Sequence, residues 1–136
     1  MERGVYSVIQ TPLDESDNID NIILEREINW IIQCGVKGLV LAMVSEVMRF
    51  SAEERRIQWQ SVLKILDKRL PLIVSVGGES TAIAVGLAKL AEADGATALM
   101  ATPPSNFPAT SEEIFKYYSS ILAATKIPLI VQYASN

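Results

Sequence analysis

Histidine is absent from this sequence of 136 residues, and cysteine occurs once, as Cys34. Without histidine there can be no Ser-His-Asp or Cys-His nucleophile system, no histidine general base and no zinc site with histidine ligands. A single cysteine cannot form an internal disulfide, so we expect a cytoplasmic protein. We also expect Cys34 to be a small buried hydrophobe. The chemistry must depend on carboxylates, hydroxyls, lysines, backbone amides or a cofactor.

Basic charge is also scarce, because 12 lysines and arginines stand against 16 acidic residues and the formal net charge is −4. Nucleic-acid-binding proteins neutralise phosphates with a basic face, so we expect no nucleic-acid partner. No apolar run reaches the length of about 18 residues that marks a membrane-spanning helix. Residues 1–12 lack the apolar stretch of a secretion signal. We therefore expect neither a membrane partner nor secretion.

Apolar residues make up 49% of the chain, which is enough to bury a core. Short apolar runs alternate with longer amphipathic segments, and this alternation predicts βα units with a parallel sheet covered by helices. The runs at 5–9, 38–43, 71–76, 98–101 and 128–132 predict strands, and the segments 22–33, 52–68, 81–91 and 111–124 predict helices.

Capping signals support these helices. Ser51 and Thr110 each precede a glutamate by three residues, which is the spacing of a capping box. Gly35 and Gly95 follow helical segments and suit the left-handed position after a helix end.

Two α/β architectures fit this order: an open doubly wound sheet, or part of a (β/α)8 TIM barrel, whose complete form needs about 250 residues. A doubly wound sheet usually has a glycine-rich first turn that holds phosphate, but residues 10–13 contain no glycine. Because neither a nucleotide loop nor a metal-ligand cluster appears, we expect no cofactor. We predict that residues 1–136 form a single N-terminal portion of a TIM barrel.

Both architectures place a functional site at the carboxyl ends of the strands. Glu46 follows the second strand, where it can orient a polar network or, alternatively, serve as a solvated loop carboxylate beside Arg49. The amides of Gly77 and Gly78 precede a helix and can hold an anion, but a tight turn before the cap at Ser80 is the simpler explanation of these two glycines.

Lysine could serve as a nucleophile only in an apolar setting that lowers its pKa. None of the lysines lies within a predicted strand, so we expect all of them to be solvated charges. They are Lys37, Lys64, Lys68, Lys89, Lys116 and Lys126.

Segments at all five predicted strands together resemble the first five strands of the dihydrodipicolinate synthase / N-acetylneuraminate lyase family of class I aldolases. The resemblance is carried by residues 4–12, 35–46, 74–81, 101–108 and 127–133. It implies a TIM barrel in which a lysine of the sixth strand forms a Schiff base with a pyruvate-type keto acid. That strand has no counterpart in these residues.

This sequence also departs from the family's catalytic motifs at several positions. The family's Gly-Thr-Thr-Gly-Glu motif corresponds to residues 42–46, where Glu46 matches and Ser45 is the one hydroxyl. The family's tyrosine after strand four corresponds to Pro104 or Ser105. Its tyrosine at the end of strand five corresponds to Gln132, with Tyr133 next to it.

We therefore predict a divergent Schiff-base lyase or aldolase, inactive as the 136-residue chain, that binds a small carboxylate-bearing carbonyl compound and forms a homo-oligomer. The alternative is a non-catalytic half-barrel, a pseudoenzyme that acts as a binding or oligomerising module. The resemblance implies Ser45, Glu46 and Tyr133 as catalytic residues. The substrate-binding residues would be Thr11, Ser45, Gly77, Gly78, Ser105 and Gln132.

Overall fold

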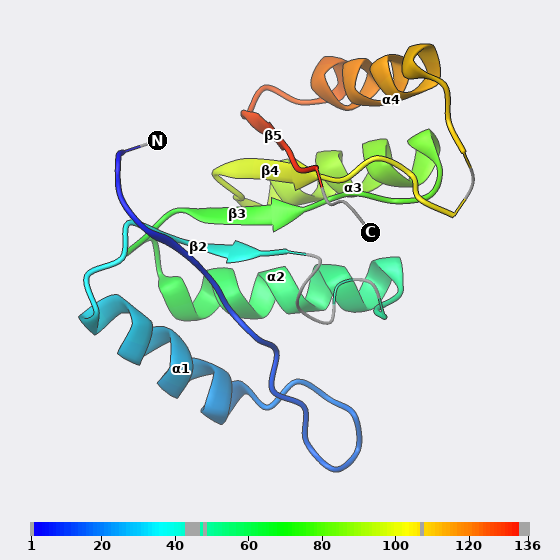
Figure 1. Ribbon diagram of the computed structural model, residues 1–136. Helices are drawn as coiled ribbons and strands as arrows, with labels where there is room; N and C mark the ends of the chain where they lie inside the picture. The colour runs from blue at the N-terminus through cyan, green and yellow to red at the C-terminus, as the bar shows by residue number, and fades with distance from the viewer. Residues whose placement is uncertain (1, 43–46, 48, 107, 134–136) are drawn as a thin grey trace.

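The computed structural model describes residues 2–42, 47, 49–106 and 108–133. Five strands and four helices alternate along this part of the chain (Figure 1). The strands are β1 (Tyr6–Val8), β2 (Gly38–Leu41), β3 (Leu72–Ser75), β4 (Ala98–Ala101) and β5 (Leu129–Val131). The helices are α1 (Asn21–Gln33), α2 (Ala52–Leu66), α3 (Thr81–Asp94) and α4 (Ser111–Ala124).

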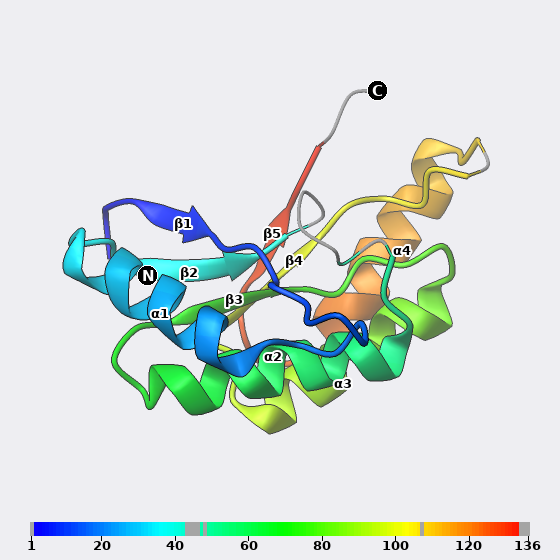
Figure 2. The same ribbon diagram turned by 90° about the horizontal axis from the view of Figure 1, so that it is seen from below.

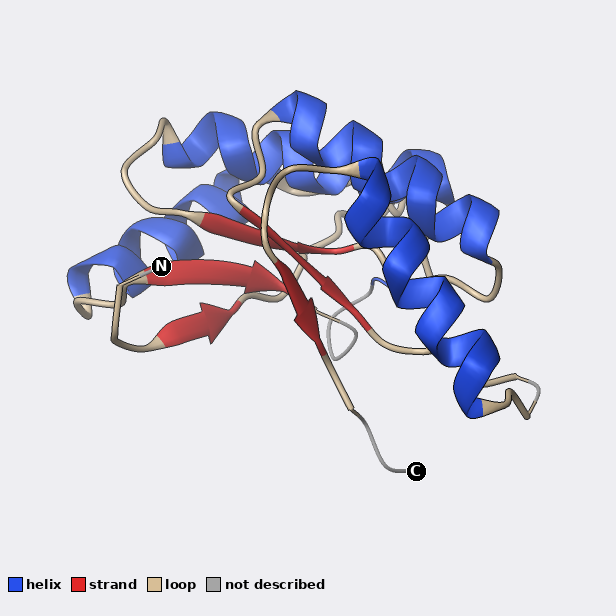
Figure 3. Ribbon diagram, turned by 90° about the horizontal axis from the view of Figure 1, so that it is seen from above, coloured by secondary structure: helices blue, strands red, loops and turns tan. Residues whose placement is uncertain are grey.

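Neighbouring strands are all parallel, and their order in the sheet is their order in the chain, β1-β2-β3-β4-β5. Figures 2 and 3 show the four helices along one face of the sheet, while the strand direction turns progressively from β1 to β5. A doubly wound sheet instead reverses its strand order and carries helices on both faces. The described residues therefore form a curved wall of successive βα units, and the predicted partial barrel is confirmed over the open sheet.

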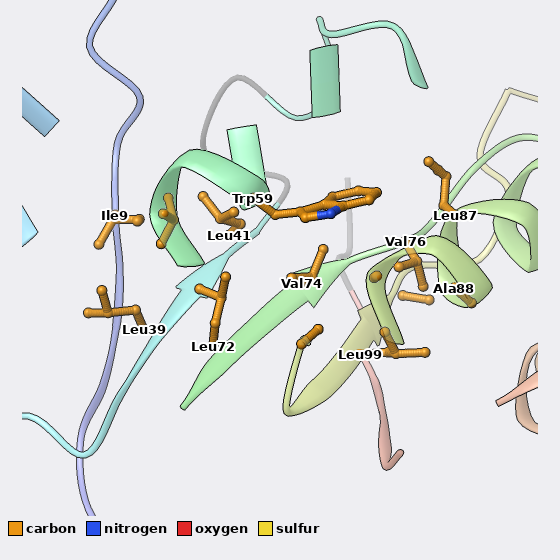
Figure 4. Packing of buried hydrophobic residues seen from close by; sticks show 14 of the residues in the cluster. Ile9, Leu39, Leu41, Trp59, Leu72, Val74, Val76, Leu87, Ala88 and Leu99 are labelled. Carbon is orange, nitrogen blue, oxygen red and sulfur yellow. The ribbon is translucent and has the colours of Figure 1, made fainter. Parts of the chain in front are cut away.

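The main core lies between the helices and the outer face of the strands. Figure 4 shows Trp59 of α2 in this core with Leu41, Val74 and Leu99 from three neighbouring strands. The concave face carries a smaller apolar cluster, because successive side chains of a strand point to opposite faces. Its buried members are Val40, Ala42, Ile73 and Ala98, and the half-buried Tyr6, Met100 and Ile130 pack against them.

The predicted caps are confirmed. The Ser51 hydroxyl accepts the N–H of Glu54, whose carboxylate accepts the N–H of Ser51 at 2.7 Å; Thr110 and Glu113 pair in the same way. Gly35 is left-handed with a φ of 81°.

Two predicted helix ends differ from the structure. Helix α2 ends at Leu66, before residue 68, because Asp67 and Lys68 take positive φ angles of 44° and 61°. Helix α3 continues past residue 91 to Asp94, and its left-handed cap is Gly95 with a φ of 107°. The sequence 91–94 has no residue that stops a helix, so the glycine sets its end.

The prediction that Cys34 is buried is wrong, because its side chain is exposed. Cys34 caps α1 through its N–H, which bonds the carbonyls of Trp30 and Ile31. The residue lies beyond the last turn of the helix, past the buried stripe of Leu24, Ile28 and Ile31 that packs on the sheet.

Candidate active site at the carboxyl ends of the strands

The five parallel strands end along one edge of the wall, so the segments that follow them lie together. This edge holds Thr11 after β1, Gly77 and Gly78 after β3, Ser105 after β4 and Gln132 after β5. Ser45 and Glu46, which the sequence analysis placed at the end of β2, lie outside the described residues.

Thr11 is buried and tied to the helix layer. Its side-chain oxygen accepts a hydrogen bond from Nε2 of Gln58, a residue of α2 that is only 1% exposed. Thr11 has a further interaction besides this hydrogen bond. A short polar side chain after β1 is thereby fixed by a donor 47 residues away in the chain.

Arg55, one turn before Gln58 on α2, reaches the end of β3. Its guanidinium donates to the carbonyl oxygens of Ser75 at 2.6 Å and Gly77 at 2.9 Å. Nε is buried and has no acceptor among the described residues. Burial disfavours the charged form and lowers the pKa of Arg55 to about 10, so the group remains a cation at neutral pH.

The two glycines after β3 differ in what their amides do. The N–H of Gly78 donates to the hydroxyl of Tyr117 on α4 at 3.1 Å. The N–H of Gly77 has no acceptor within the described part of the chain. A Cβ at Gly77 would lie 3.0 to 3.3 Å from atoms of Thr102, which is tighter than an ordinary van der Waals contact, so the close approach of the β3 and β4 ends favours glycine there.

Glu79 connects the same turn to the segment after β4. Its carboxylate accepts the N–H of Ser105 at 3.2 Å and of Asn106 at 3.0 Å, and the Ser105 hydroxyl lies 3.4 Å from it. Ser105 is exposed. The structure therefore shows Ser105 as an anchor of its own loop, held by a carboxylate.

Gln132 and Tyr133 face opposite ways after β5. The N–H of Gln132 bonds the carbonyl of Ala101 at 2.9 Å, which continues the strand pairing by one residue. Strand alternation then places Gln132 with Ile130 on the concave face. Its Oε1 is buried without a partner among the described residues, whereas Tyr133 is 84% exposed. Gln132 is thus positioned toward the barrel interior and Tyr133 away from it.

A pocket of about 150 Å³ lies at this edge, at the ends of β3 and β4. It is large enough for a small anion, since a water molecule occupies about 30 Å³ in the liquid. The pocket is lined by Val47, Phe50, Arg55, Gly77, Gly78, Glu79, Thr102 and Pro103.

The sequence analysis missed Arg55, Gln58 and the Tyr117 hydroxyl as parts of this edge. A signal was present in α2, because Arg55 and Gln58 share the helical stripe of the buried Trp59 and Val62. A buried side chain that is charged or carries an amide needs hydrogen-bond partners. Two such residues on an apolar helix stripe therefore indicate polar contacts with the sheet that the helix covers.

The described residues contain no group of three or more potential metal-ligating side chains. Within the same part of the chain, no helix combines the length and the hydropathy needed to cross a bilayer.

Comparisons with known proteins identify the family of this chain. Residues 1–134 match the model of the dihydrodipicolinate synthetase family. The chain is 32% identical over 132 residues to 4-hydroxy-tetrahydrodipicolinate synthase of Acidiphilium cryptum, covering 96% of the chain and 45% of that relative. It is 35% identical over 131 residues to N-acetylneuraminate lyase 2 of Escherichia coli O6:H1, covering 95% and 43%.

A third relative and a solved structure extend the comparison. L-2-keto-3-deoxyarabonate dehydratase of Azospirillum brasilense is 29% identical over 136 residues, covering 97% of the chain and 44% of that protein. The structure of the 4-hydroxy-tetrahydrodipicolinate synthase from Methylacidiphilum fumariolicum SolV superposes with a TM-score of 0.91 at 28% identity, covering 96% and 44%. The chain spans less than half the length of these proteins, and it belongs to the dihydrodipicolinate synthase family.

Proposed function

We propose that the chain forms the N-terminal βα units of a divergent Schiff-base lyase or aldolase that acts on a small carboxylate-bearing carbonyl compound. The supporting observation is the family match over residues 1–134 together with polar groups at the strand ends. Relatives include a dehydratase as well as a lyase, so both carbon–carbon and carbon–oxygen bond cleavage belong to the proposal.

The lysine nucleophile of this reaction comes from outside these 136 residues. Every lysine of the chain is exposed, and none lies on a strand. A lysine becomes a good nucleophile toward a carbonyl in an apolar setting, which an exposed position does not provide. The isolated chain therefore binds its ligand without forming a covalent adduct.

The keto acid lies at the strand ends in this proposal. Thr11, Ser45, Gly77, Gly78, Ser105 and Gln132 bind it, with Ser45, Glu46 and Tyr133 as the groups nearest the reacting atoms. The exposure of Tyr133 means that its hydroxyl acts only if the end of β5 rotates or if a further segment packs over it. No cofactor is part of this proposal, and the compartment is the cytoplasm.

Reduction with borohydride in the presence of pyruvate tests the proposal on the chain as it is. Intact-mass analysis is expected to show unmodified protein, while amide chemical shifts at Gly77 and Gly78 move on addition of pyruvate. A reduced pyruvate adduct on any of the six lysines would contradict the proposed absence of the nucleophile. Unchanged amide shifts at high pyruvate concentration would contradict the proposed ligand class.

A second candidate function, a non-catalytic module that forms a homo-oligomer, is favoured by the two ends of the sheet. Within the described residues β1 and β5 each pair on one side only, and Val5 and Val131 are 68% and 59% exposed. Unpaired strand edges and exposed apolar side chains promote association. A well-behaved monomer in sedimentation velocity at several concentrations would contradict this candidate.

A further inference from the structure

Gln132 carries a buried hydrogen-bond acceptor that the described fold does not use. Its Oε1 is enclosed and has no hydrogen-bond partner within the described residues. The backbone N–H of Gln132 donates to the carbonyl of Ala101 at 2.9 Å, so the residue is held in the direction of β5. A carbonyl that is buried without a donor destabilises a protein, and such groups are rare in native structures. The acceptor therefore indicates a donor that the described residues do not supply.

The surroundings of Gln132 on the concave face are uncharged. Ile130, two residues earlier on β5, and Met100 of β4 belong to the apolar cluster of this face. The register of β4 and β5 continues to Thr102, which lies beside Gln132. A cationic donor would need a counter-charge in such surroundings, because an unpaired charge is costly to desolvate. The site of Oε1 thus favours a neutral donor.

Gln132 can hold a donor but cannot take its proton. Glutamine is not among the side chains that serve as general acids or bases, since its amide neither gains nor loses a proton near neutral pH. The adjacent Tyr133, which has an ionisable hydroxyl, is 84% exposed and lies on the other side of the strand. The group that meets Gln132 is therefore bound there without being deprotonated. A hydroxyl group is the neutral donor that the carbon chain of a small keto acid can carry.

We infer that Gln132 is a specificity-determining residue that accepts a hydrogen bond from a hydroxyl group on the carbon chain of the ligand. The inference rests on the proposed function and narrows its substrate class to hydroxylated keto acids. Rotation about the last side-chain torsion of glutamine, which is broad, turns Oε1 toward a ligand on the concave face. A keto acid without the hydroxyl leaves the acceptor unpaired and binds more weakly.

The test compares pyruvate with hydroxypyruvate, which differs from it by one hydroxyl group, on the 136-residue protein. Dissociation constants are taken from amide chemical shifts. The original protein is expected to bind hydroxypyruvate about tenfold more tightly than pyruvate. Gln132→Met removes the acceptor at similar side-chain length, and it is expected to bring the two affinities within about twofold by weakening hydroxypyruvate alone.

Two further variants separate the acceptor from other effects of substitution. Gln132→Glu keeps an oxygen acceptor and adds a negative charge. It is expected to retain the preference for hydroxypyruvate while it binds both anionic ligands more weakly. Gln33→Met changes an exposed glutamine at the last residue of α1, and it is expected to leave both affinities unchanged.

The thermal midpoint of the ligand-free protein gives an independent readout. Gln132→Met is expected to raise it, because an apolar group replaces a buried carbonyl that has no donor. A lower midpoint would overturn the inference, since it would show that the amide of Gln132 serves the fold.

Three binding results would also overturn the inference. They are equal affinities of the original protein for the two ligands, a preference for hydroxypyruvate that survives in folded Gln132→Met, and equal losses for both ligands in that variant. If Gln132→Met does not fold, Gln132→Leu carries the same expectation, and failure of both to fold assigns Gln132 to the fold alone. Absence of binding of either ligand to the original protein is a different result, which contradicts the proposed function itself.

Discussion

Arg56 of α2 and Asp94 at the end of α3 form a bidentate ion pair, with Nε and one terminal nitrogen 2.9 and 3.0 Å from the two carboxylate oxygens. The same carboxylate accepts the indole N–H of Trp59 at 2.9 Å and the amide of Gln60 at 3.1 Å. Three residues of one helix therefore hold the end of the next helix through four hydrogen bonds, and the Asp94 carboxylate connects two adjacent βα units of the wall.

The first prediction concerns the stability of the fold at acid pH. Hydrogen bonding from Arg56 lowers the pKa of Asp94 from 3.8 to about 2. A carboxyl group whose pKa is lowered in the folded state stabilises the protein fully above its unfolded pKa. This stability is lost as the pH falls from about 4 toward 2, because the unfolded chain binds the proton first. Asp94→Asn is expected to cost about 1–2 kcal/mol of unfolding free energy at pH 7.

Urea unfolding of both proteins between pH 7 and pH 2 measures this effect. The difference between Asp94→Asn and the original protein should shrink across the acid end of that range. A difference that stays constant down to pH 2 would show that the charge of Asp94 contributes nothing.

The second prediction uses the glycine at the crowded end of β3. Gly77→Ala places a Cβ 3.0 Å from the side-chain oxygen and 3.1 Å from the backbone nitrogen of Thr102, so Thr102 must shift by a few tenths of an ångström. We expect a loss of about 1–3 kcal/mol in unfolding free energy. Gly86→Ala in α3 is the matched control, since its Cβ meets no atom within 4 Å and alanine favours a helix by about 1 kcal/mol. Thermal unfolding that ranks the two variants in the opposite order would contradict the close packing at Gly77.

The third prediction is a coupling between two buried polar groups. Thr11→Val leaves the Nε2 of Gln58 without its acceptor, and we expect a cost of about 1–3 kcal/mol. Gln58→Leu combined with Thr11→Val replaces both members by apolar groups, so the double variant should lose less than the sum of the single losses. Denaturant unfolding of the four proteins gives the coupling energy directly. Strictly additive losses would mean that the hydrogen bond does not stabilise the fold.

The fourth prediction concerns the open edge of the sheet. Val131→Lys at the exposed side of β5 is expected to lower the apparent mass of the protein in sedimentation velocity, because charge on an edge strand opposes pairing between chains. Phe115→Lys is the control, as Phe115 is 75% exposed on the helix α4 and takes no part in strand pairing. An equal effect of both variants would assign the association to general surface hydrophobicity rather than to strand pairing.

The order of the elements could be predicted from the sequence because each βα unit carries local signals. Ser51 with Glu54 marks a helix start, and Gly35 marks a helix end. Each of these features depends on residues a few positions apart, so it can be recognised without knowing the tertiary structure.

The polar contacts of the site could be predicted only in part, because they join residues that are distant in the sequence. Thr11 and Gln58 are 47 positions apart, and Gly78 and Tyr117 are 39 apart. Burial of a long polar side chain such as Arg55 depends on where a neighbouring strand ends. Glu46 and Ser45 remain sequence-based predictions, since they lie outside the described residues.

The most direct measurement uses a chain that has been extended to a complete barrel. A fifth helix and three further βα units from a relative, with a lysine on the first added strand, are joined to this chain, and the product is reduced with borohydride in the presence of pyruvate. Peptide mass mapping is expected to find the adduct on the added strand lysine and none on the six lysines of the 136 residues. A folded barrel with no adduct, or an adduct on any of those six lysines, would contradict the proposal that this wall binds the keto acid and that its nucleophile lies elsewhere.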